Sequence, residues 1–185
     1  MGESHHRRSI RLPGYDYAQA GAYFVTICTH QRECLLGQVH GGAVRLSDYG
    51  ELVEECWRGL PLHFGHIEVD VHVIMPNHIH GIILILGEAP DGGSAGRYRP
   101  ALPPSGASPL QPANGTRPGS LSAIVQNLKS VSARRINQLC GTPGAAVWQR
   151  NYYEHIIRNE RRLAEVRRYI LENPARWDLD HYNVG

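Results

Sequence analysis

The sequence lacks paired cysteines and long apolar runs. Its 185 residues include four cysteines, but none of them forms a CxxC motif, which argues against a zinc ribbon or a redox pair. Scattered cysteines are typical of reduced thiols in a cytosol. There is no signal peptide and no apolar run near the roughly 18 residues that a membrane-spanning helix needs. These absences predict a cytoplasmic protein that does not enter a membrane.

Lysine is almost missing as well. Of the 19 lysines and arginines only Lys129 is a lysine, and arginines crowd the last third of a chain whose net charge is only +2. The planar arginine side chain is suited to bidentate contact with phosphate. Ordinary solvated helix faces, or codon usage in a GC-rich genome, would explain the same pattern.

The common catalytic motifs are also absent. The sequence has no Walker loop, no GxSxG, no HExxH and no Rossmann glycine fingerprint. The best-known hydrolase and dinucleotide-binding classes are therefore not indicated, and the chemistry has to come from another arrangement of side chains.

The apolar fraction of 42% is enough for a core, and the length suits one domain. We expect a single domain over residues 1–185. The segment 87–119 is dominated by glycine, proline, alanine and serine, and its composition predicts a flexible insertion.

Hydrophobic periodicity predicts an alternation of strands and helices. Helix caps are expected at Ser47 and Ser120, and a turn at Pro76-Asn77. Strands are expected at 22–29, 67–75 and 78–86, a strand or edge element at 147–157, and helices from 47 to 59, 120–140 and 160–172. This order predicts an α+β fold, a ferredoxin-like sandwich with one antiparallel sheet and helices packed on one face.

Two histidines stand one residue apart inside an apolar stretch. On an extended strand, residues i and i+2 point to the same face, so His78 and His80 would present both imidazoles to one point. Polar side chains on a buried strand need hydrogen-bond partners or a bound ion. The pair is therefore either structural or part of a metal site.

The last predicted helix carries a tyrosine beside its apolar stripe. Leu163, Val166 and Ile170 fall on one face, and Tyr169 lies on its flank, one turn before Asn173. Taken alone, the usual interpretation is a packing tyrosine and a helix-terminal asparagine.

Combined with the histidines, this helix predicts a metal site. Two imidazoles and a helix side-chain oxygen form a facial site with open positions, which makes His78, His80 and Asn173 candidate ligands of Mg²⁺ or Mn²⁺. Imidazole favours Mn²⁺, Zn²⁺ or Fe²⁺ over Mg²⁺, and an oxygen-rich outer shell still admits Mg²⁺. Tyr169 could attack a metal-bound phosphate, although its pKa near ~10 requires activation.

Three blocks of sequence carry a resemblance to a known family. They are V-I-M-P-N-H-I-H-G-I at 73–82, W-Q-R-N-Y-Y-E-H-I-I-R at 148–158 and Y-I-L-E-N-P at 169–174. Together they resemble the HUH endonucleases, and more specifically the REP-associated tyrosine transposases, relatives of the single-tyrosine transposases of small bacterial insertion sequences. The resemblance runs from about residue 8 to residue 177.

The resemblance implies a bacterial enzyme that nicks and rejoins single-stranded DNA at hairpins. Tyr169 would be the nucleophile, forming a 5′-phosphotyrosine and leaving a free 3′-hydroxyl, and rejoining would need no ATP. Related transposases often have a glutamine, one methylene longer, at the position of Asn173. Direct ligation by Asn173, helix capping and a contact through water therefore all stay open.

The resemblance also implies DNA as the partner, and arginines are the expected contacts. We assign to DNA binding Arg7, Arg8, Arg11, Arg158, Arg162, Arg167 and Arg168. Tyr15, Tyr17 and Tyr23 would either stack on unpaired bases or pack at the sheet edge. The family includes monomers and homodimers, and either state is compatible with the sequence.

Several alternatives stay open. Tyr152 and Tyr153 are rival nucleophiles, and His72 and His155 are assigned structural or DNA-facing positions. The main functional alternative is a domesticated hairpin-binding protein without strand transfer. A plasmid-type replication initiator fits less well, because we find no second catalytic tyrosine on the helix and expect no helicase domain. A metal-dependent hydrolase of small phosphoesters would be active without DNA and would not depend on Tyr169.

Overall fold

The computed structural model describes residues 15–87 and 117–183. The basic arm with Arg7, Arg8 and Arg11, and most of the segment 87–119, lie outside the described residues. That the chain is one domain with a flexible insertion stays a prediction.

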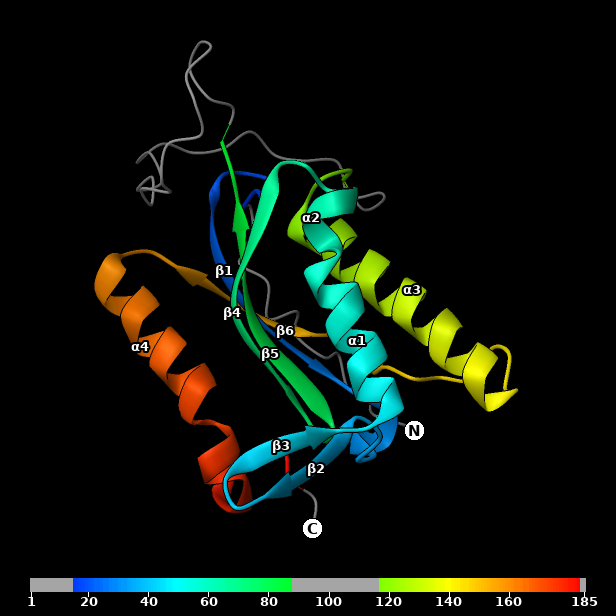
Figure 1. Ribbon diagram of the computed structural model, residues 1–185. Helices are drawn as coiled ribbons and strands as arrows, with labels where there is room; N and C mark the ends of the chain where they lie inside the picture. Colours follow the sequence, from blue (N-terminus) through cyan, green and yellow to red (C-terminus); the bar gives the residue numbers. More distant parts are fainter. Residues whose placement is uncertain (1–14, 88–116, 184–185) are drawn as a thin grey trace, which may run out of the picture.

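Four strands form an antiparallel sheet in the order β4–β5–β1–β6 (Figure 1). They are β1 (Gly21–Cys28), β4 (Ile67–Met75), β5 (His78–Ile85) and β6 (Tyr153–Ile157). Helix α1 (Asp48–Arg58) lies between β1 and β4 in the chain, and α3 (Leu121–Cys140) between β5 and β6. This order is the ferredoxin-like arrangement, so the predicted α+β fold is confirmed.

The remaining elements are short, apart from a last helix. A hairpin of β2 (Gly37–His40) and β3 (Ala43–Leu46) precedes α1, and α2 (Leu60–His63) follows it. One-turn 3₁₀ segment η1 (His30–Arg32) follows β1, and η2 (Pro174–Leu179) follows α4 (Glu160–Glu172). No helix in the described ranges has the length and apolar character to cross a bilayer.

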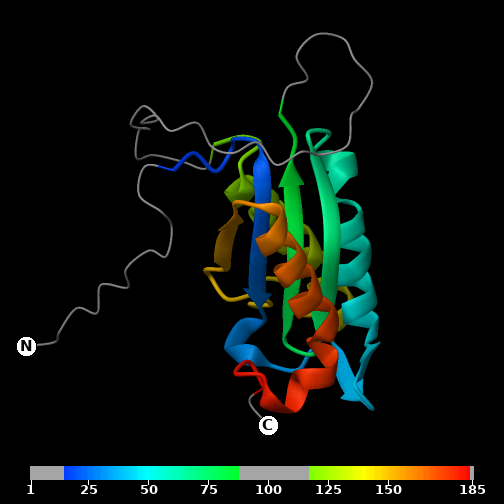
Figure 2. The same ribbon diagram turned by 90° about the vertical axis from the view of Figure 1, so that its left-hand side faces the viewer.

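The helices form layers on the sheet. The predicted packing of helices on one face is confirmed for the two crossover helices: Trp57 of α1 and Ile124 of α3 pack in one core cluster with Val25 and Ile79 of the strands. Helix α4 lies across the opposite face (Figures 1 and 2). Its predicted stripe, Leu163, Val166 and Ile170, is buried there against Ala22, Phe24, Ile82 and Leu84.

The central strand β5 explains why both faces are covered. All of its residues are buried, and apart from His78 and His80 they are apolar or glycine. An apolar strand with only one face covered would leave half of these side chains in water. The helices on the two faces remove that cost, and His78 and His80 lie on the face that α4 covers.

Local signals set the helix boundaries. The predicted caps are confirmed: the Ser47 hydroxyl accepts a hydrogen bond from the Gly50 amide at 3.2 Å, and Ser120 accepts one from Ala123 at 3.4 Å. Asn159 caps α4, its side-chain oxygen 2.8 Å from the Arg162 amide. Gly141 ends α3 with φ of +65°, a conformation that glycine adopts without strain.

A salt bridge fixes α4 to the edge of the sheet. Both Nε and Nη2 of Arg167 lie 2.7 Å from Oδ2 of Asp70, a residue at the irregularity of β4. The Asp70 side chain is only 18% exposed, so the pair is partly shielded from water. The contact holds the helix that carries Tyr169 at a defined position over the strands.

Helix α1 packs closely on the sheet at Gly81. The Trp57 ring is fully buried there and stacks on His72, with ring centroids 5.5 Å apart. A Cβ atom at position 81 would lie 2.3 Å from Cζ2 of Trp57, well inside van der Waals contact. Glycine is therefore required at position 81 because there is no room for a Cβ atom, and not because the backbone adopts a conformation that favours glycine.

We predict that Gly81→Ala lowers the free energy of unfolding by about 1–3 kcal/mol, the usual cost of overpacking a core. Chemical denaturation followed by tryptophan fluorescence measures this change. Gly65→Ala is the matched control, because a Cβ atom at that position has nothing within 4 Å. Equal stability of the two variants would contradict the packing described above.

Candidate metal and tyrosine site

His78 and His80 lie side by side on the face of the sheet that α4 covers. Their ring centroids are 4.4 Å apart, and their side chains are 0% and 1% exposed. The strand geometry thus places both imidazoles at one point, as the alternation of β5 predicted. The hydrogen-bond partners of the two rings determine which of their nitrogens can bind a metal ion.

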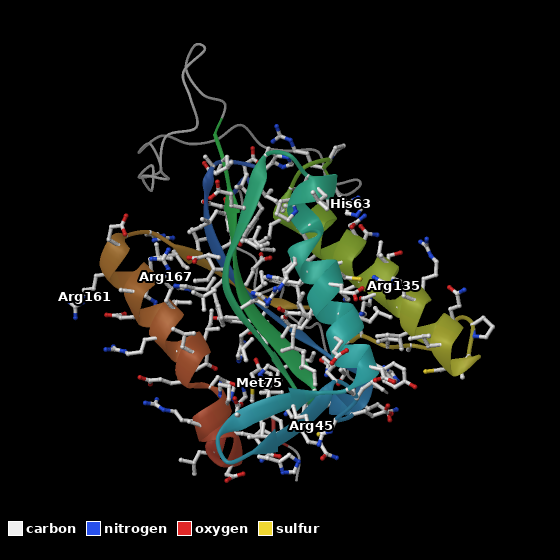
Figure 3. The ribbon with its side chains drawn as sticks, in the orientation of Figure 1. Arg45, His63, Met75, Arg135, Arg161 and Arg167 are labelled. Carbon is white, nitrogen blue, oxygen red and sulfur yellow. The ribbon has the colours of Figure 1, made fainter. Side chains whose placement is uncertain are left out.

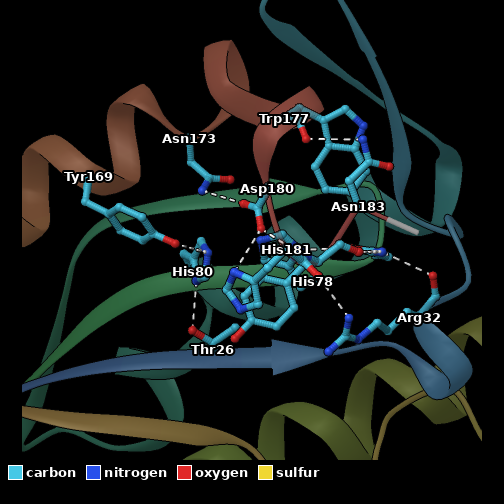
Figure 4. A network of polar contacts seen from close by, with 12 residues as sticks. Thr26, Arg32, His78, His80, Tyr169, Asn173, Trp177, Asp180, His181 and Asn183 are labelled. Carbon is cyan, nitrogen blue, oxygen red and sulfur yellow. Dashed lines mark hydrogen bonds and ion pairs between the residues drawn. The ribbon is translucent and has the colours of Figure 1, made fainter. Parts of the chain in front are cut away.

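One nitrogen of each ring is held by a neighbour. Nδ1 of His78 lies 2.8 Å from Oδ1 of Asn77. Nδ1 of His80 lies 2.8 Å from the Thr26 hydroxyl (Figure 4). Nδ2 of Asn77 donates to the carbonyls of Arg32 and Tyr182, which fixes the orientation of that amide. The Asn77 oxygen must therefore accept from His78, so Nδ1 carries the proton and Nε2 keeps a lone pair.

The lone pair of His78 points into the site. Within the described residues, Nε2 of His78 is buried and has no hydrogen-bond partner. Asp180 approaches the same place, and one ligand atom each of His78, His80 and Asp180 lie within 4.8 Å of one another. Two imidazole nitrogens and a carboxylate oxygen are a donor set that divalent metals accept. These residues therefore fit a metal ion, which would satisfy the buried nitrogen.

Burial keeps both imidazoles neutral. Desolvation, with smaller contributions from His181 and Arg32, lowers the pKa of His78 to about 3. Desolvation and the neighbouring His78 also hold the pKa of His80 well below its usual value, although Asp180 opposes them. Neutral imidazole is the form that binds metals, so no proton has to leave before an ion can bind near neutral pH.

Tyr169 reaches the histidines from α4. Its hydroxyl lies 3.1 Å from Nε2 of His80, and its ring packs edge-on against Phe24. Burial and the Asp180 carboxylate raise the pKa of Tyr169, while the Asn173 amide opposes this. The phenol is therefore protonated at neutral pH, and its ring is still 39% exposed to solvent.

Asn173 contacts the acidic residue of the group. It is only 3% exposed, and its amide nitrogen donates to Oδ2 of Asp180 at 2.9 Å (Figure 4). The amide oxygen is buried without a hydrogen-bond partner in the described ranges. These contacts place Asn173 beside the group, and direct binding of a metal by Asn173 stays a prediction.

Sequence reasoning missed the segment that follows η2. Asp180 supplies the carboxylate, and the Tyr182 ring lies over His78 with centroids 4.6 Å apart. Arg32 holds this segment by donating to the His181 carbonyl at 3.0 Å and by stacking on Tyr182. Burial raises the pKa of Tyr182 to about 12. The only signal in the sequence was an acidic residue shortly after the tyrosine helix, and nothing local ties it to β5.

The other tyrosines and the histidine His72, which the sequence also brought into consideration, have different surroundings. Tyr152 packs toward the core on the α3 side, its hydroxyl 3.4 Å from that of Ser122. Tyr15, Tyr17 and Tyr23 pack against one another in the same cluster, so packing explains their positions. His72 pairs with Glu54 at 2.7 Å behind the sheet.

The predicted arginines differ in their surroundings. Arg167 is engaged by Asp70, whereas Arg168 is exposed. Arg162 is half exposed and lies 3.1 Å from Glu165, which also pairs with Arg161. Figure 3 shows Arg161 pointing away from the sheet and Arg167 toward it.

Two adjoining hollows open beside the group. One, of about 500 Å³, is lined by His80, Tyr169, Tyr153 and Tyr182 among others. The second, of about 640 Å³, runs past β6 and is lined by Arg158 and Arg161. His155, Arg162 and Glu165 line both hollows, so the two lie next to each other.

Comparison with known proteins supports the fold and a family. No family model matches the chain. A Haemophilus influenzae protein described as uncharacterised is 38% identical over 183 residues, covering 97% of this chain and 94% of its own length.

Two solved structures are similar in shape. A REP-associated tyrosine transposase bound to a REP hairpin has a TM-score of 0.55 and 18% identity, over 91% of this chain and 73% of that one. A putative transposase from Deinococcus radiodurans R1 has a TM-score of 0.44 and 17% identity, over 88% and 95% of the two chains. The first similarity confirms the resemblance at the level of the fold. The chain therefore belongs to the same family as the Haemophilus influenzae protein and has the fold of a REP-associated tyrosine transposase.

Proposed function

We propose that the protein is a metal-dependent single-stranded DNA endonuclease and transposase that nicks and rejoins DNA at hairpins through a 5′-phosphotyrosine. The observation that carries the proposal is the Tyr169 hydroxyl, 3.1 Å from His80, beside a group that could hold a metal ion. The transposase that shares its fold was solved with a REP hairpin, which favours hairpin DNA as the partner.

The proposed reaction exchanges one phosphodiester for another. The Tyr169 oxygen attacks the phosphorus, a P–O–Tyr bond forms, and the bond to the 3′-oxygen breaks. The phenol loses its proton and the 3′-oxygen gains one, so a later attack by a 3′-hydroxyl reverses the step without ATP. Arg162, at the rim of the hollow, is the candidate contact for the phosphate.

In this proposal the chain's own residues prepare the metal site. His78, His80 and Asp180 would hold Mg²⁺ or Mn²⁺, Asn77 fixes the His78 ring, and Asn173 orients Asp180. The ion would supply charge neutralisation at the phosphate. Two imidazole ligands favour Mn²⁺ over Mg²⁺, and the carboxylate is compatible with both.

A hairpin-binding protein without strand transfer is the second candidate. Two observations favour it. The raised pKa of Tyr169 keeps the phenol protonated at neutral pH, which makes it a weak nucleophile, and the Tyr182 ring covers His78. Both candidates predict hairpin binding, and only the first predicts a covalent complex. A cytoplasmic location, and a monomer or a homodimer, stay predictions in either case.

Tyr169→Phe tests the nucleophile. The wild-type protein, incubated with a labelled hairpin oligonucleotide and Mn²⁺ or Mg²⁺, should give a protein–DNA band that survives a denaturing gel. Because the variant lacks the attacking oxygen, we expect the yield to fall at least about 100-fold. Binding of the oligonucleotide, measured by fluorescence anisotropy, should change little.

Tyr152→Phe is the matched control and should keep the covalent band, since this tyrosine packs on the α3 side. A band that persists in Tyr169→Phe would disprove the assignment. Absence of any band with wild-type protein, together with tight hairpin binding, would favour the second candidate.

Mn²⁺ binding, measured by isothermal titration calorimetry, tests the ligands. Changes in outer-shell partners cost about 10- to 100-fold in metal affinity, so loss of a ligand should cost more than about 100-fold. We expect His78→Ala and Asp180→Ala to show the larger loss and Asn173→Ala the smaller one.

His63→Ala, an exposed histidine on α2, is the control and should bind Mn²⁺ like the wild type. If Asn173→Ala loses more affinity than Asp180→Ala, then Asn173 is the third ligand and Asp180 is not. If His78→Ala binds like the wild type, the histidine pair is structural.

A further inference from the structure

Tyr153 occupies a particular place beside the candidate site. In the strand register Tyr153 of β6 lies opposite Thr26 of β1, and Thr26 lies opposite His80 of β5. Neighbouring strands are about 4.8 Å apart, so Tyr153 stands about 10 Å from His80 along this row. The row continues the face that carries the metal group out to the edge strand.

The Tyr153 ring is available to a ligand. It is 44% exposed, although it lies on the face that α4 covers, and its ring meets Phe24 edge-on at 6.2 Å between centroids. The same Phe24 supports Tyr169, with ring centroids 6.0 Å apart. One buried ring thus fixes the positions of two partly exposed tyrosines that line a single hollow of about 500 Å³.

Arginines border this hollow and the one beside it. Arg162 lines the first hollow together with Glu165, with which it pairs. Arg158 and Arg161 line the adjoining hollow, so along this path three arginines stand against the two glutamates Glu154 and Glu165. An exposed aromatic ring next to guanidinium groups matches an unpaired base and its phosphate.

We propose that Tyr153 is a stacking platform for the unpaired base of a nucleotide next to the phosphate that Tyr169 attacks. The proposal rests on the proposed function for the identity of the ligand, and it adds a base-binding subsite to that function. Stacking depends on the face of a base and not on its edges, so this subsite accepts any base. It also gives Tyr153 a part other than that of a rival nucleophile.

The experiment measures the coupling between the ring and one base. The probe is the hairpin oligonucleotide of the adduct assay, with a single-stranded flank in which each base in turn is replaced by an abasic site. Affinity is measured by fluorescence anisotropy in EDTA, so that metal-dependent cleavage does not occur. The variants are Tyr153→Ala, Tyr153→Thr, which suits a β-strand, and Tyr153→Phe, which keeps the ring.

With wild-type protein we expect one flank position at which the abasic site weakens binding by about 5- to 140-fold, the range of a single base–aromatic stack. Tyr153→Phe should keep this loss. Tyr153→Ala and Tyr153→Thr should bind the intact oligonucleotide more weakly and show no further loss at that position. A 2-aminopurine base at that position should be quenched by the wild type and by Tyr153→Phe only.

The proposal is overturned if no position shows the loss, or if the loss persists in Tyr153→Ala and Tyr153→Thr. Circular dichroism identifies a variant that does not fold, and the other variant then decides. The adduct assay separates this proposal from the proposed function. A covalent band without coupling rejects the subsite alone, coupling without a band rejects strand cleavage alone, and no binding of any hairpin rejects both. A band lost in Tyr153→Phe but kept in Tyr169→Phe would make Tyr153 the nucleophile.

Discussion

The burial of two imidazoles on the central strand is the constraint on which the candidate site depends. Inside the protein, His78 and His80 cannot carry charge at low cost, and every polar nitrogen they bring needs a partner. Asn77, Thr26 and Tyr169 lie within hydrogen-bond distance of three of the four nitrogens, and within the described residues the fourth, Nε2 of His78, has no partner. The two rings and Asp180 form a group that could hold a metal ion, which would give that nitrogen a partner.

The sheet and the helices packed on it position Tyr169 beside the two histidines. Because β5 is apolar on both faces, helices must cover both, and the helix on the histidine face is the one that bears Tyr169. The cap at Asn159 and the pair between Arg167 and Asp70 fix that helix along and across the strands. The phenol and the imidazoles are therefore positioned by separate elements that share one hydrophobic layer, which is how a rigid site is built from distant segments.

The residues that follow α4 contribute a carboxylate to the site and also cover part of it. Asp180 provides the carboxylate, Asn173 fixes that carboxylate, and the Tyr182 ring covers His78. Arg32 belongs to η1, where Gln31 and Arg32 have φ of +52° and +59°, values that residues other than glycine rarely adopt. Strain of this kind persists only where surrounding contacts enforce it, and here the contacts are those between η1 and residues 181 and 182.

Four features could be predicted from the sequence alone: the order of the elements, the caps at Ser47 and Ser120, the common face of His78 and His80, and the buried stripe of α4. All of these follow from periodicities and capping preferences that act over a few residues. Three others emerge only when the chain has folded: α4 lies on the histidine face, Tyr152 turns toward the other core, and Asp180 reaches the site. Those outcomes depend on which buried surfaces meet after the sheet has formed. Asp180 is 102 residues from His78 in the chain, and no local pattern encodes a contact over that distance.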